Sequence, residues 1–237
     1  MHVDIRHFAE FYQTPMGRRV AEGLGRAIHD PAAKNPHDLI VGLGYSQPFL
    51  ENFGGDGPQK LALMPATLGA MQTSSIPQAM CLPHLLPLRD ASVHSLLLIH
   101  GLEHAEYPKL MLREVWRVLQ DDGSATIVVP YRPGFWARSS EQPFGLGTPY
   151  SSRQLRNLLE GNGYSIEYLG FGLHFPPWQR GQRFLPTLAR LYRFCRLPAG
   201  VLVIRAKKSL LQPVQNLSKT FNREKILLPA QQPQRLP

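Results

Sequence analysis

The sequence is poor in cysteine and has no long apolar run. Its two cysteines, Cys81 and Cys195, are too few for a disulfide framework and are not spaced like the ligands of a metal site. No apolar segment approaches the ~20 residues that cross a membrane, and the first residues lack the apolar stretch of a secretory signal peptide. We therefore expect a cytoplasmic protein whose thiols are reduced.

Acidic residues are scarce only in the C-terminal quarter. Residues 176–237 hold 12 Lys and Arg against the single acidic residue Glu224, whereas residues 1–175 hold 14 basic and 16 acidic residues. The formal net charge of +9 therefore belongs to that quarter, which argues against a specific nucleic-acid partner for the fold as a whole. The arginines of a predicted helix at 180–196 suit either a solvated face or a weak contact with an anionic membrane surface.

The rest of the composition is that of one globular domain. With 43% hydrophobic residues, the chain can bury one sizeable core. Beyond Ser209 the sequence is rich in Pro and Gln and offers few residues that could pack together. We expect a single domain over residues 1–208 and a disordered basic tail over residues 209–237.

The segment from 86 to 133 organises the predicted fold. Two short apolar runs, Ser95–Ile99 and Ala125–Val129, flank apolar residues at helical spacing. Pro108 suits the first turn of that helix, and Asp121-Asp122-Gly123 should end it. Runs that are apolar on both faces are typical of parallel strands covered by helices, joined in a right-handed crossover. The sequence therefore predicts an α/β fold with a doubly wound, mostly parallel sheet.

Similar patterns extend this unit in both directions. Two glycines, Gly42 and Gly44, follow the first predicted strand directly and precede a short helix that begins at Pro48. Glycines at such a corner let the backbone pass close to a ligand, and the helix N-terminus adds free N–H groups. The corner favours a ligand site, and a simple tight turn is the alternative. The remaining strands are predicted at 38–45, 60–64, 79–82, 165–169 and 200–206, and the remaining helices at 15–29, 151–160 and 183–196.

Two stretches around the central crossover carry a family pattern. They are residues 86–93, LPLRDASV, and residues 114–123, EVWRVLQDDG. Both resemble class I S-adenosylmethionine-dependent methyltransferases, in the branch of small-molecule enzymes with "LPF-x-D-x-SFD" and "E-x-x-RVLKPGG" patterns. The resemblance spans residues 36–206. It implies a Rossmann-like, seven-stranded methyltransferase fold that transfers a methyl group from S-adenosylmethionine to a small-molecule acceptor.

The resemblance also implies where the cofactor binds. That family holds it across the C-terminal ends of the first, second and fourth strands, the usual ligand crevice of such sheets. The acidic residues typical of the first, second and third strand ends are replaced here by Gly42, Met64 and Leu82, and Ser46 replaces a glycine. The motif is thus a variant with fewer polar contacts to the cofactor. The positions that match the site are Gly42, Leu43, Gly44, Tyr45, Met64, Pro65, Leu86, His100 and Gly101.

Residues 100–104, HGLEH, follow the fourth predicted strand. The spacing fits the H-x-x-E-H pattern of inverted zincins, but that pattern needs one helix face and the predicted helix starts only near Pro108. We therefore expect no metal here. His100 and His104 are candidates for a catalytic base because they lie at the strand end beside the crevice. The long loop at 131–150, after the predicted strand at 125–129, is open to two interpretations. It could line an acceptor pocket, or it could be a surface loop pinned by aromatic residues; the residues concerned are Tyr131, Arg132, Trp136, Arg138, Phe144 and Tyr150.

Two other functional classes remain open. The three missing acids also fit a degenerate, non-catalytic member of the family that acts as a binding or scaffold protein. A nicotinamide-dependent oxidoreductase on a similar sheet is disfavoured, because the turn lacks a full G-x-G-x-x-G and no acid follows the second strand. A cofactor-binding assay separates the first class from an enzyme, and the cofactor retained on purification identifies the second.

Overall fold

The computed structural model describes residues 4–28, 35–54, 57–69, 71, 75–175, 177 and 199–209. The predicted basic helix at 180–196 lies outside the described residues, as does the predicted tail apart from Ser209. None of the helices that the structure describes is long and apolar enough to cross a membrane.

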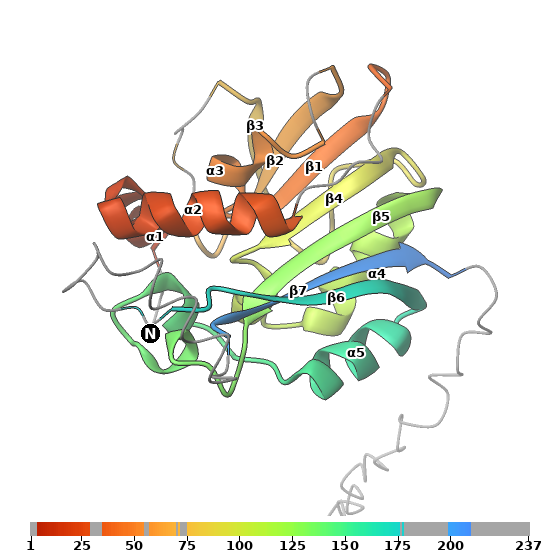
Figure 1. Ribbon diagram of the computed structural model, residues 1–237. Coiled ribbons are helices and arrows are strands. Elements are labelled where there is room, and N and C mark those ends of the chain that lie inside the picture. The colour runs from red at the N-terminus through yellow and green to blue at the C-terminus, as the bar shows by residue number, and fades with distance from the viewer. Residues whose placement is uncertain are drawn as a thin grey trace, which may run out of the picture.

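A seven-stranded sheet forms the centre of the protein (Figure 1). Its strands lie in the order β3-β2-β1-β4-β5-β7-β6, and β7 runs antiparallel to both of its neighbours. The predicted α/β class with a doubly wound, mostly parallel sheet is confirmed, as a mixed sheet with one antiparallel strand. The strands are β1 (Leu39–Gly44), β2 (Gln59–Pro65), β3 (Gln78–Cys81), β4 (Val93–Ile99), β5 (Leu119–Pro130), β6 (Tyr164–Gly172) and β7 (Val201–Lys208).

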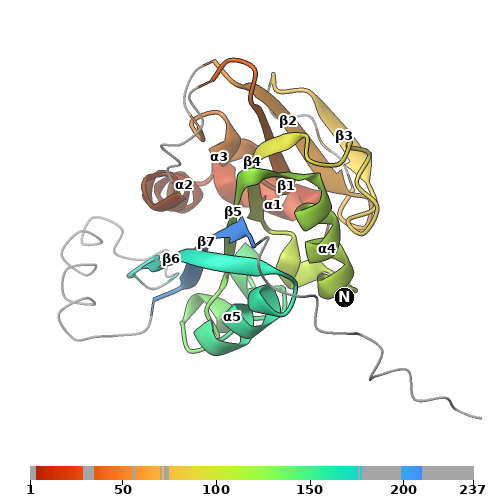
Figure 2. The same cartoon turned by 90° about the vertical axis from the view of Figure 1, so that its right-hand side faces the viewer.

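Helices cover the two faces of the sheet, so the core has two halves (Figure 2). On one face lie α1 (Ile5–Gln13), α2 (Pro15–Ile28) and the short α3 (Gln47–Leu50). On the other lie α4 (Pro108–Val118) and α5 (Ser152–Glu160). The chain reverses its direction of winding between β1 and β4, and the crevice at such a switch point is where open α/β sheets bind ligands.

Local signals set most of the helix starts. Helix α2 begins at Pro15, as predicted, and α5 has the predicted capping box, in which Ser151 and Gln154 exchange side-chain-to-backbone hydrogen bonds. Helix α1 was not predicted. Asp4 caps its N-terminus by accepting a hydrogen bond from the Arg6 N–H at 2.9 Å.

The predicted end of α4 was wrong. The helix ends at Val118, and Asp121-Asp122-Gly123 lies within the first half of β5. Leu119 already has extended backbone angles and pairs with Val93 of β4, next to a register shift in that ladder. Strand pairing therefore begins before the turn-forming residues are reached. Lys208 of β7 adds an ion pair to Asp121 at 3.2 Å.

Candidate functional site

The corner after β1 is built by a close approach of two strand ends. Gly44 has φ +91°, and a β-carbon there would lie 2.3 Å from the Ile99 carbonyl oxygen and 2.9 Å from the His100 carbonyl carbon. A β-carbon on Gly101 would in turn lie 3.5 Å from the Gly44 Cα atom. Glycine is therefore required at 44 by both backbone angle and space. Three predicted site residues, Gly44, His100 and Gly101, come together here.

The two departures from the family glycine motif are coupled in space. A β-carbon on Gly42 would lie only 2.1 Å from the Ser46 hydroxyl oxygen and 2.8 Å from its β-carbon. The Ser46 side chain thus fills the space that an acidic side chain at 42 would need. The Ser46 Oγ atom is buried, and no described residue forms a hydrogen bond with it.

Aromatic side chains of α1 cover the ends of β1 and β4. Phe8 stacks on Tyr45 with ring centroids 5.6 Å apart and on His100 at 4.8 Å. Tyr12 stacks on Tyr45 at 5.7 Å, and its hydroxyl lies 2.7 Å from the His100 Nε2 atom. All four of these side chains are buried. In this arrangement α1 closes the crevice, a role that reading the sequence missed although buried Ile5, Phe8 and Tyr12 recur at helical spacing.

A compact acid–base cluster, the His100 cluster, consists of His100, Glu103 and His104. Glu103 and His104 belong to a short 3₁₀ helix, Leu102–His104, directly after β4. The Nδ1 atom of His100 lies 3.2 Å from Oε1 of Glu103, and neither side chain is exposed. One possible metal-ligating atom from each of the three residues lies within 4.8 Å of the others. We expected no metal here because the three residues would not share one helix face. The 3₁₀ turn nevertheless brings their candidate ligand atoms close together.

Protonation within this cluster follows from burial and proximity. Burial raises the pKa of Glu103, but the contact with His100 and the electrostatic effects of His104 and His100 outweigh it, so the pKa lies below its ordinary value. Burial lowers the pKa of His104, against the opposing effect of Glu103. The pKa of Tyr12 is raised well above its ordinary value by burial, then by Tyr45 and Glu103, so Tyr12 stays a neutral phenol. Glu103 is accordingly an anion beside a neutral His104 at neutral pH.

His100 also has an unusual backbone. Its φ is +51°, in the left-handed region that a residue with a β-carbon rarely adopts. The conformation costs of the order of 1–3 kcal/mol and is kept only where the surroundings enforce it. Here Phe144 at 4.4 Å, Phe8 and Tyr12 hold the ring. Strain of this kind is common at functional sites.

The long loop after β5 closes the other side of the cluster. It contains two 3₁₀ turns, Trp136–Arg138 and Pro143–Gly145, and the Trp136 and Phe144 side chains are buried. The Thr148 N–H donates to the Glu103 carbonyl at 2.8 Å, and a β-carbon on Gly147 would lie 2.5 Å from the Glu103 Cγ atom. The loop is therefore packed against the site.

The six loop residues predicted as acceptor contacts do not share one environment. Trp136 and Phe144 lie in the core, Tyr131 and Tyr150 are half-buried, and Arg132 and Arg138 are exposed. Burial, then the charge of Glu103, raises the pKa of Tyr150, so this half-buried phenol stays neutral near the cluster.

The other predicted cofactor residues divide between the two faces. Met64 and Pro65 end β2, beside Met80 and Cys81 of β3, and the Met64 side chain lies in the same half of the core as Tyr45. Leu43 and Leu86 lie in the other half, with α4. Leu86 is thus held on the α4 side of the sheet, and the sequence pattern alone did not reveal this.

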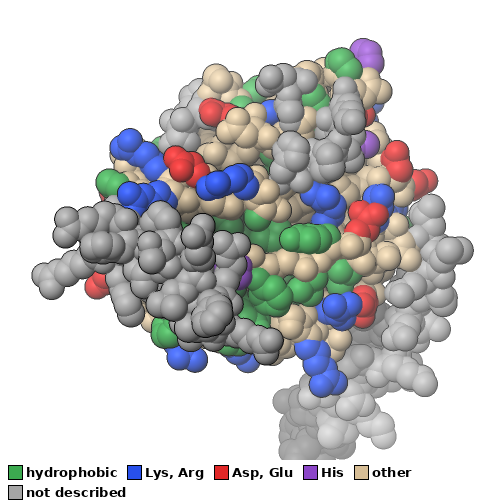
Figure 3. Space-filling model, viewed as in Figure 1, with side chains coloured by type: hydrophobic (Ala, Val, Ile, Leu, Met, Phe, Trp, Pro, Cys, Tyr) green, Lys and Arg blue, Asp and Glu red, His purple; other side chains and the backbone are tan. Residues whose placement is uncertain are grey.

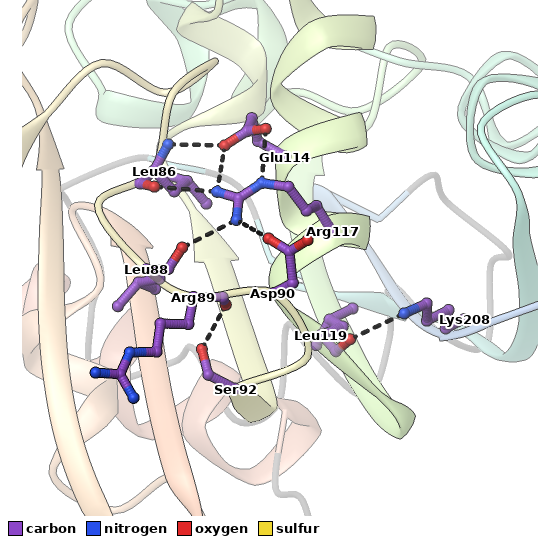
Figure 4. Close-up of polar contacts among 9 residues, drawn as sticks. All are labelled: Leu86, Leu88, Arg89, Asp90, Ser92, Glu114, Arg117, Leu119 and Lys208. Atoms are coloured by element: carbon purple, nitrogen blue, oxygen red, sulfur yellow. Dashed lines mark hydrogen bonds and ion pairs between the residues drawn. The ribbon is translucent and has the colours of Figure 1, made fainter.

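The residues that carry the family resemblance form a second polar cluster, the Arg117 network, which consists of Leu86, Leu88, Asp90, Glu114 and Arg117 (Figure 4). The Arg117 guanidinium donates to the carbonyls of Leu86 and Leu88 at 3.1 and 2.9 Å. It also donates to both carboxylate oxygens of Glu114, at 3.0 and 2.7 Å, and to Asp90 at 2.5 Å. The Leu86 N–H donates to Glu114 at 2.9 Å. This pattern ties the segment before β4 to α4.

One face of the surface carries charges of both signs. On the face shown in Figure 3, Lys and Arg side chains alternate with Asp and Glu, and hydrophobic side chains gather in a band across the sheet. The predicted membrane contact at 180–196 lies outside the described residues and stays a prediction.

Comparisons with known proteins agree with the strand order. A family model described as a methyltransferase domain matches residues 23–127. A chain from the complex between the Haloferax volcanii Trm112 methyltransferase activator and a methyltransferase shares the fold with a TM-score of 0.63, at 16% identity, over 86% of this chain and 96% of that one. A Thermotoga maritima S-adenosylmethionine-dependent methyltransferase gives a TM-score of 0.62 at 15% identity, over 86% and 96% of the two chains.

A geranyl diphosphate C-methyltransferase from Streptomyces coelicolor, solved with S-adenosyl-L-homocysteine, gives a TM-score of 0.57 at 12% identity, over 81% of each chain. No curated protein matches this chain in sequence. At these identities the solved structures establish the fold alone. The family model matches a stretch of sequence that includes β1, β2, β4 and α4. Residues 23–127 therefore match the methyltransferase-domain family, and the described chain has the fold of S-adenosylmethionine-dependent methyltransferases.

Proposed function

We propose that the protein transfers a methyl group from S-adenosylmethionine to a small-molecule acceptor at the C-terminal ends of β1, β2 and β4. One observation carries the proposal: the Gly44 corner lies against His100 and Gly101, next to a buried group of acid–base side chains. A corner with φ +91° and no side chain is where backbone could contact a cofactor, and the neighbouring cluster is where an acceptor could lose a proton.

The cofactor would be held mainly by backbone and apolar groups. The turn from Gly44 to Ser46 and the backbone of Gly101 offer N–H and carbonyl groups, and Met64 and Tyr45 offer apolar surface for the adenine ring. Because Tyr45 and Ser46 are buried beneath α1, binding requires α1 to move away from the strand ends. The backbone tie that holds α1 to the region after β2 is the hydrogen bond from the Ile5 N–H to the Leu68 carbonyl at 2.9 Å.

The side chains of the protein need not form a covalent bond with the methyl group in this reaction. The sulfonium of the bound cofactor supplies an already activated methyl group, so the chain's residues contribute mainly position and orientation. His104 is the better candidate for a base, because burial lowers its pKa and leaves it neutral and able to accept a proton from the acceptor. His100 is fixed between Tyr12 and Glu103 and serves better as a positioning residue.

Because Gly42 and Ser46 are coupled in space, cofactor binding can be tested with a variant that should strengthen it, and not only with variants that disrupt the corner. Gly42→Asp alone should overpack against Ser46 and lower the free energy of unfolding by about 1–3 kcal/mol. Gly42→Asp combined with Ser46→Gly restores the family pattern and makes room for the carboxylate. The double variant should regain stability and bind the positively charged cofactor about tenfold more tightly than wild type, since a charge-assisted hydrogen bond contributes about 1.5–3 kcal/mol.

The measurement is calorimetry of S-adenosylmethionine binding to wild type, both single variants and the double variant, with circular dichroism to confirm folding. Ser46→Gly alone is the matched control for the loss of the hydroxyl. If neither wild type nor the folded double variant binds the cofactor at millimolar concentration, the methyltransferase proposal fails. The closed packing of α1 on the crevice would then favour the second candidate, a non-catalytic binding or scaffold protein.

A further inference from the structure

We propose that His100, Glu103 and His104 form a binding site for a divalent transition-metal ion, with zinc the best match to the donors. Two imidazoles and one carboxylate are a donor set that binds zinc in catalytic sites, where the fourth position stays open to a water molecule or substrate. The residues come from one five-residue segment that joins the end of β4 to its 3₁₀ turn. Their candidate ligand atoms lie within 4.8 Å of one another.

The cluster has buried polar atoms that its protein neighbours do not satisfy. Among the described residues, none forms a hydrogen bond of acceptable geometry with Nδ1 of His100, either carboxylate oxygen of Glu103, or Nε2 of His104. The Glu103 side chain has no exposed area, so its oxygens cannot rely on bulk solvent. Buried carboxylates are normally hydrogen-bonded, paired or bound to metal. Glu103 is paired with His100 through one oxygen, at 3.2 Å, and its other oxygen, like Nε2 of His104, is left for a shared ligand.

The distances suit a site that tightens when the ion binds. Zinc lies ~2.0–2.1 Å from nitrogen ligands, so the donors of a tetrahedral site lie roughly 3.3 Å apart. The 3.2 Å between His100 Nδ1 and Glu103 Oε1 already fits this spacing. His104, which is only half-buried, can supply the remaining movement by a change of rotamer.

The surroundings resemble the outer shell of a metal site. A histidine that binds metal through one ring nitrogen usually donates a hydrogen bond from the other, which fixes its tautomer. Here Tyr12 lies 2.7 Å from Nε2 of His100, so the phenol oxygen can accept that hydrogen bond while Nδ1 faces Glu103. Phe8 and Phe144 pack on the His100 ring and exclude water from this side.

A metal ion at this site would indicate which chemical class of small molecule accepts the methyl group. This consequence rests on the proposed function, because it takes the ends of β1 and β4 to be the site of methyl transfer. The open position of the ion would bind an oxygen of the acceptor and lower the pKa of its hydroxyl, as zinc does for bound water. In the metal-bound protein His104 would be a ligand and not the base, and the hydroxyl proton would pass to water. The acceptor would then be a small molecule with a hydroxyl group.

The test measures metal binding directly, on the full chain without an affinity tag and after removal of metal with a chelator. Zn²⁺ is titrated by calorimetry, and Co²⁺ serves as a spectroscopic probe, since a tetrahedral site gives visible absorption bands. Glu103→Gln and His104→Gln should each weaken Zn²⁺ binding more than about 100-fold, because losing an outer-shell partner alone costs ~10–100-fold. Tyr12→Phe should weaken it about tenfold.

His94→Gln is the matched control. His94 lies on the same strand as His100 but near its other end, 3.8 Å from Asp38, and should leave Zn²⁺ affinity unchanged. The proposal is overturned if folded wild type shows neither heat of Zn²⁺ binding nor Co²⁺ bands, or if His94→Gln weakens binding as much as His104→Gln. His104→Gln remains decisive should Glu103→Gln fail to fold, because His104 is only half-buried.

S-adenosylmethionine binding, measured on the same preparations, separates this proposal from the preceding one. Zn²⁺ binding without cofactor binding would keep the metal site and refute the methyltransferase proposal. Cofactor binding without Zn²⁺ binding would refute the metal site and keep the methyltransferase proposal.

Discussion

The Arg117 network and the His100 cluster lie at opposite ends of β4, and their polar atoms are satisfied to very different degrees. In the Arg117 network, the guanidinium and the Glu114 carboxylate share hydrogen bonds with each other and with backbone groups of Leu86 and Leu88. In the His100 cluster, both Glu103 oxygens lack hydrogen bonds from the described residues, although the side chain is fully buried. Polar groups that are fully hydrogen-bonded within the protein stabilise the fold, whereas buried polar groups without hydrogen bonds are typical of a ligand site.

The difference also separates two uses of the family pattern. The stretches that make the sequence recognisable, 86–93 and 114–123, contribute the Arg117 network, which joins the segment before β4 to α4. The residues that we propose form the site lie at 42–46, where the sequence departs from the pattern, and at 100–104. A strong family signal therefore supports the fold more directly than it supports catalysis.

The largest expected effect comes from removing Arg117. Arg117→Met keeps most of the side-chain volume but leaves the Leu86 and Leu88 carbonyls and the Glu114 carboxylate without their donor. We expect the free energy of unfolding to fall by about 3 kcal/mol, measured by urea denaturation monitored by circular dichroism. Arg117→Lys is the control. It should recover only part of the loss, because an ammonium group cannot reproduce the planar set of donors. A loss below about 1 kcal/mol for Arg117→Met would contradict the structural role.

Glu114→Gln should have the next largest effect. The carboxylate accepts hydrogen bonds from Arg117 and the Leu86 N–H, and the amide would place a donor against one of them. We expect a loss of about 2 kcal/mol at neutral pH. The hydrogen bond from Arg117 outweighs burial and lowers the pKa of Glu114, so its contribution is full above the unfolded-state pKa of ~4.3 and is lost as pH falls through the folded-state value.

The pH dependence supplies the check on that variant. Wild type should lose stability as pH falls below the unfolded-state pKa of ~4.3, and the Glu114→Gln curve should be flatter over the same range. Urea denaturation at several pH values measures both curves. Parallel curves would show that Glu114 does not titrate as the structure indicates.

How far the sequence predicted these features depends on the range of the interactions involved. The capping box at Ser151 and the start of α2 at Pro15 are set by neighbouring residues, and the sequence predicted both. The end of α4 was wrong because Leu119 pairs with Val93, which lies 26 positions earlier in the chain. Local propensity did not reveal that competition.

The site itself depended on contacts that no local pattern contains. Phe8 and Tyr12 reach residues some 90 positions away, so the closure of the crevice by α1 could not be deduced from the amphipathic stretch alone. The coupling of Gly42 to Ser46 requires the turn geometry, because only the turn brings the hydroxyl to the place of the missing side chain. The spacing of His100, Glu103 and His104 was noticed in the sequence, but the sequence predicted no metal there. That their ligand atoms converge depends on the left-handed backbone of His100 and the 3₁₀ turn that follows.

Glu103→Gln sharpens the comparison because it repeats the chemical change of Glu114→Gln in the other cluster. Glu103→Gln removes the 3.2 Å pair with His100 but also removes the cost of burying a carboxylate, so the metal-free protein should change in stability by less than about 1 kcal/mol. The variant should instead lose the rise in melting temperature that Zn²⁺ gives to wild type. Thermal denaturation with and without Zn²⁺ measures both quantities. A loss as large as that of Glu114→Gln in metal-free protein would identify Glu103 as a structural residue.

The smallest effect is expected at the exposed end of the Arg117 network. Asp90 lies 2.5 Å from Arg117, but 79% of its side chain is exposed, whereas Glu114 is largely covered. Solvent screens such a pair, and ordering two side chains offsets part of the attraction, so Asp90→Asn should cost less than about 0.5 kcal/mol. Its effect should also shrink as salt is added, while that of Glu114→Gln should persist, because partly buried pairs are screened less. Urea denaturation at low and high ionic strength tests both statements. A salt-independent loss at Asp90 comparable with that of Glu114→Gln would mean that the exposed acid, and not the backbone carbonyls, positions the guanidinium.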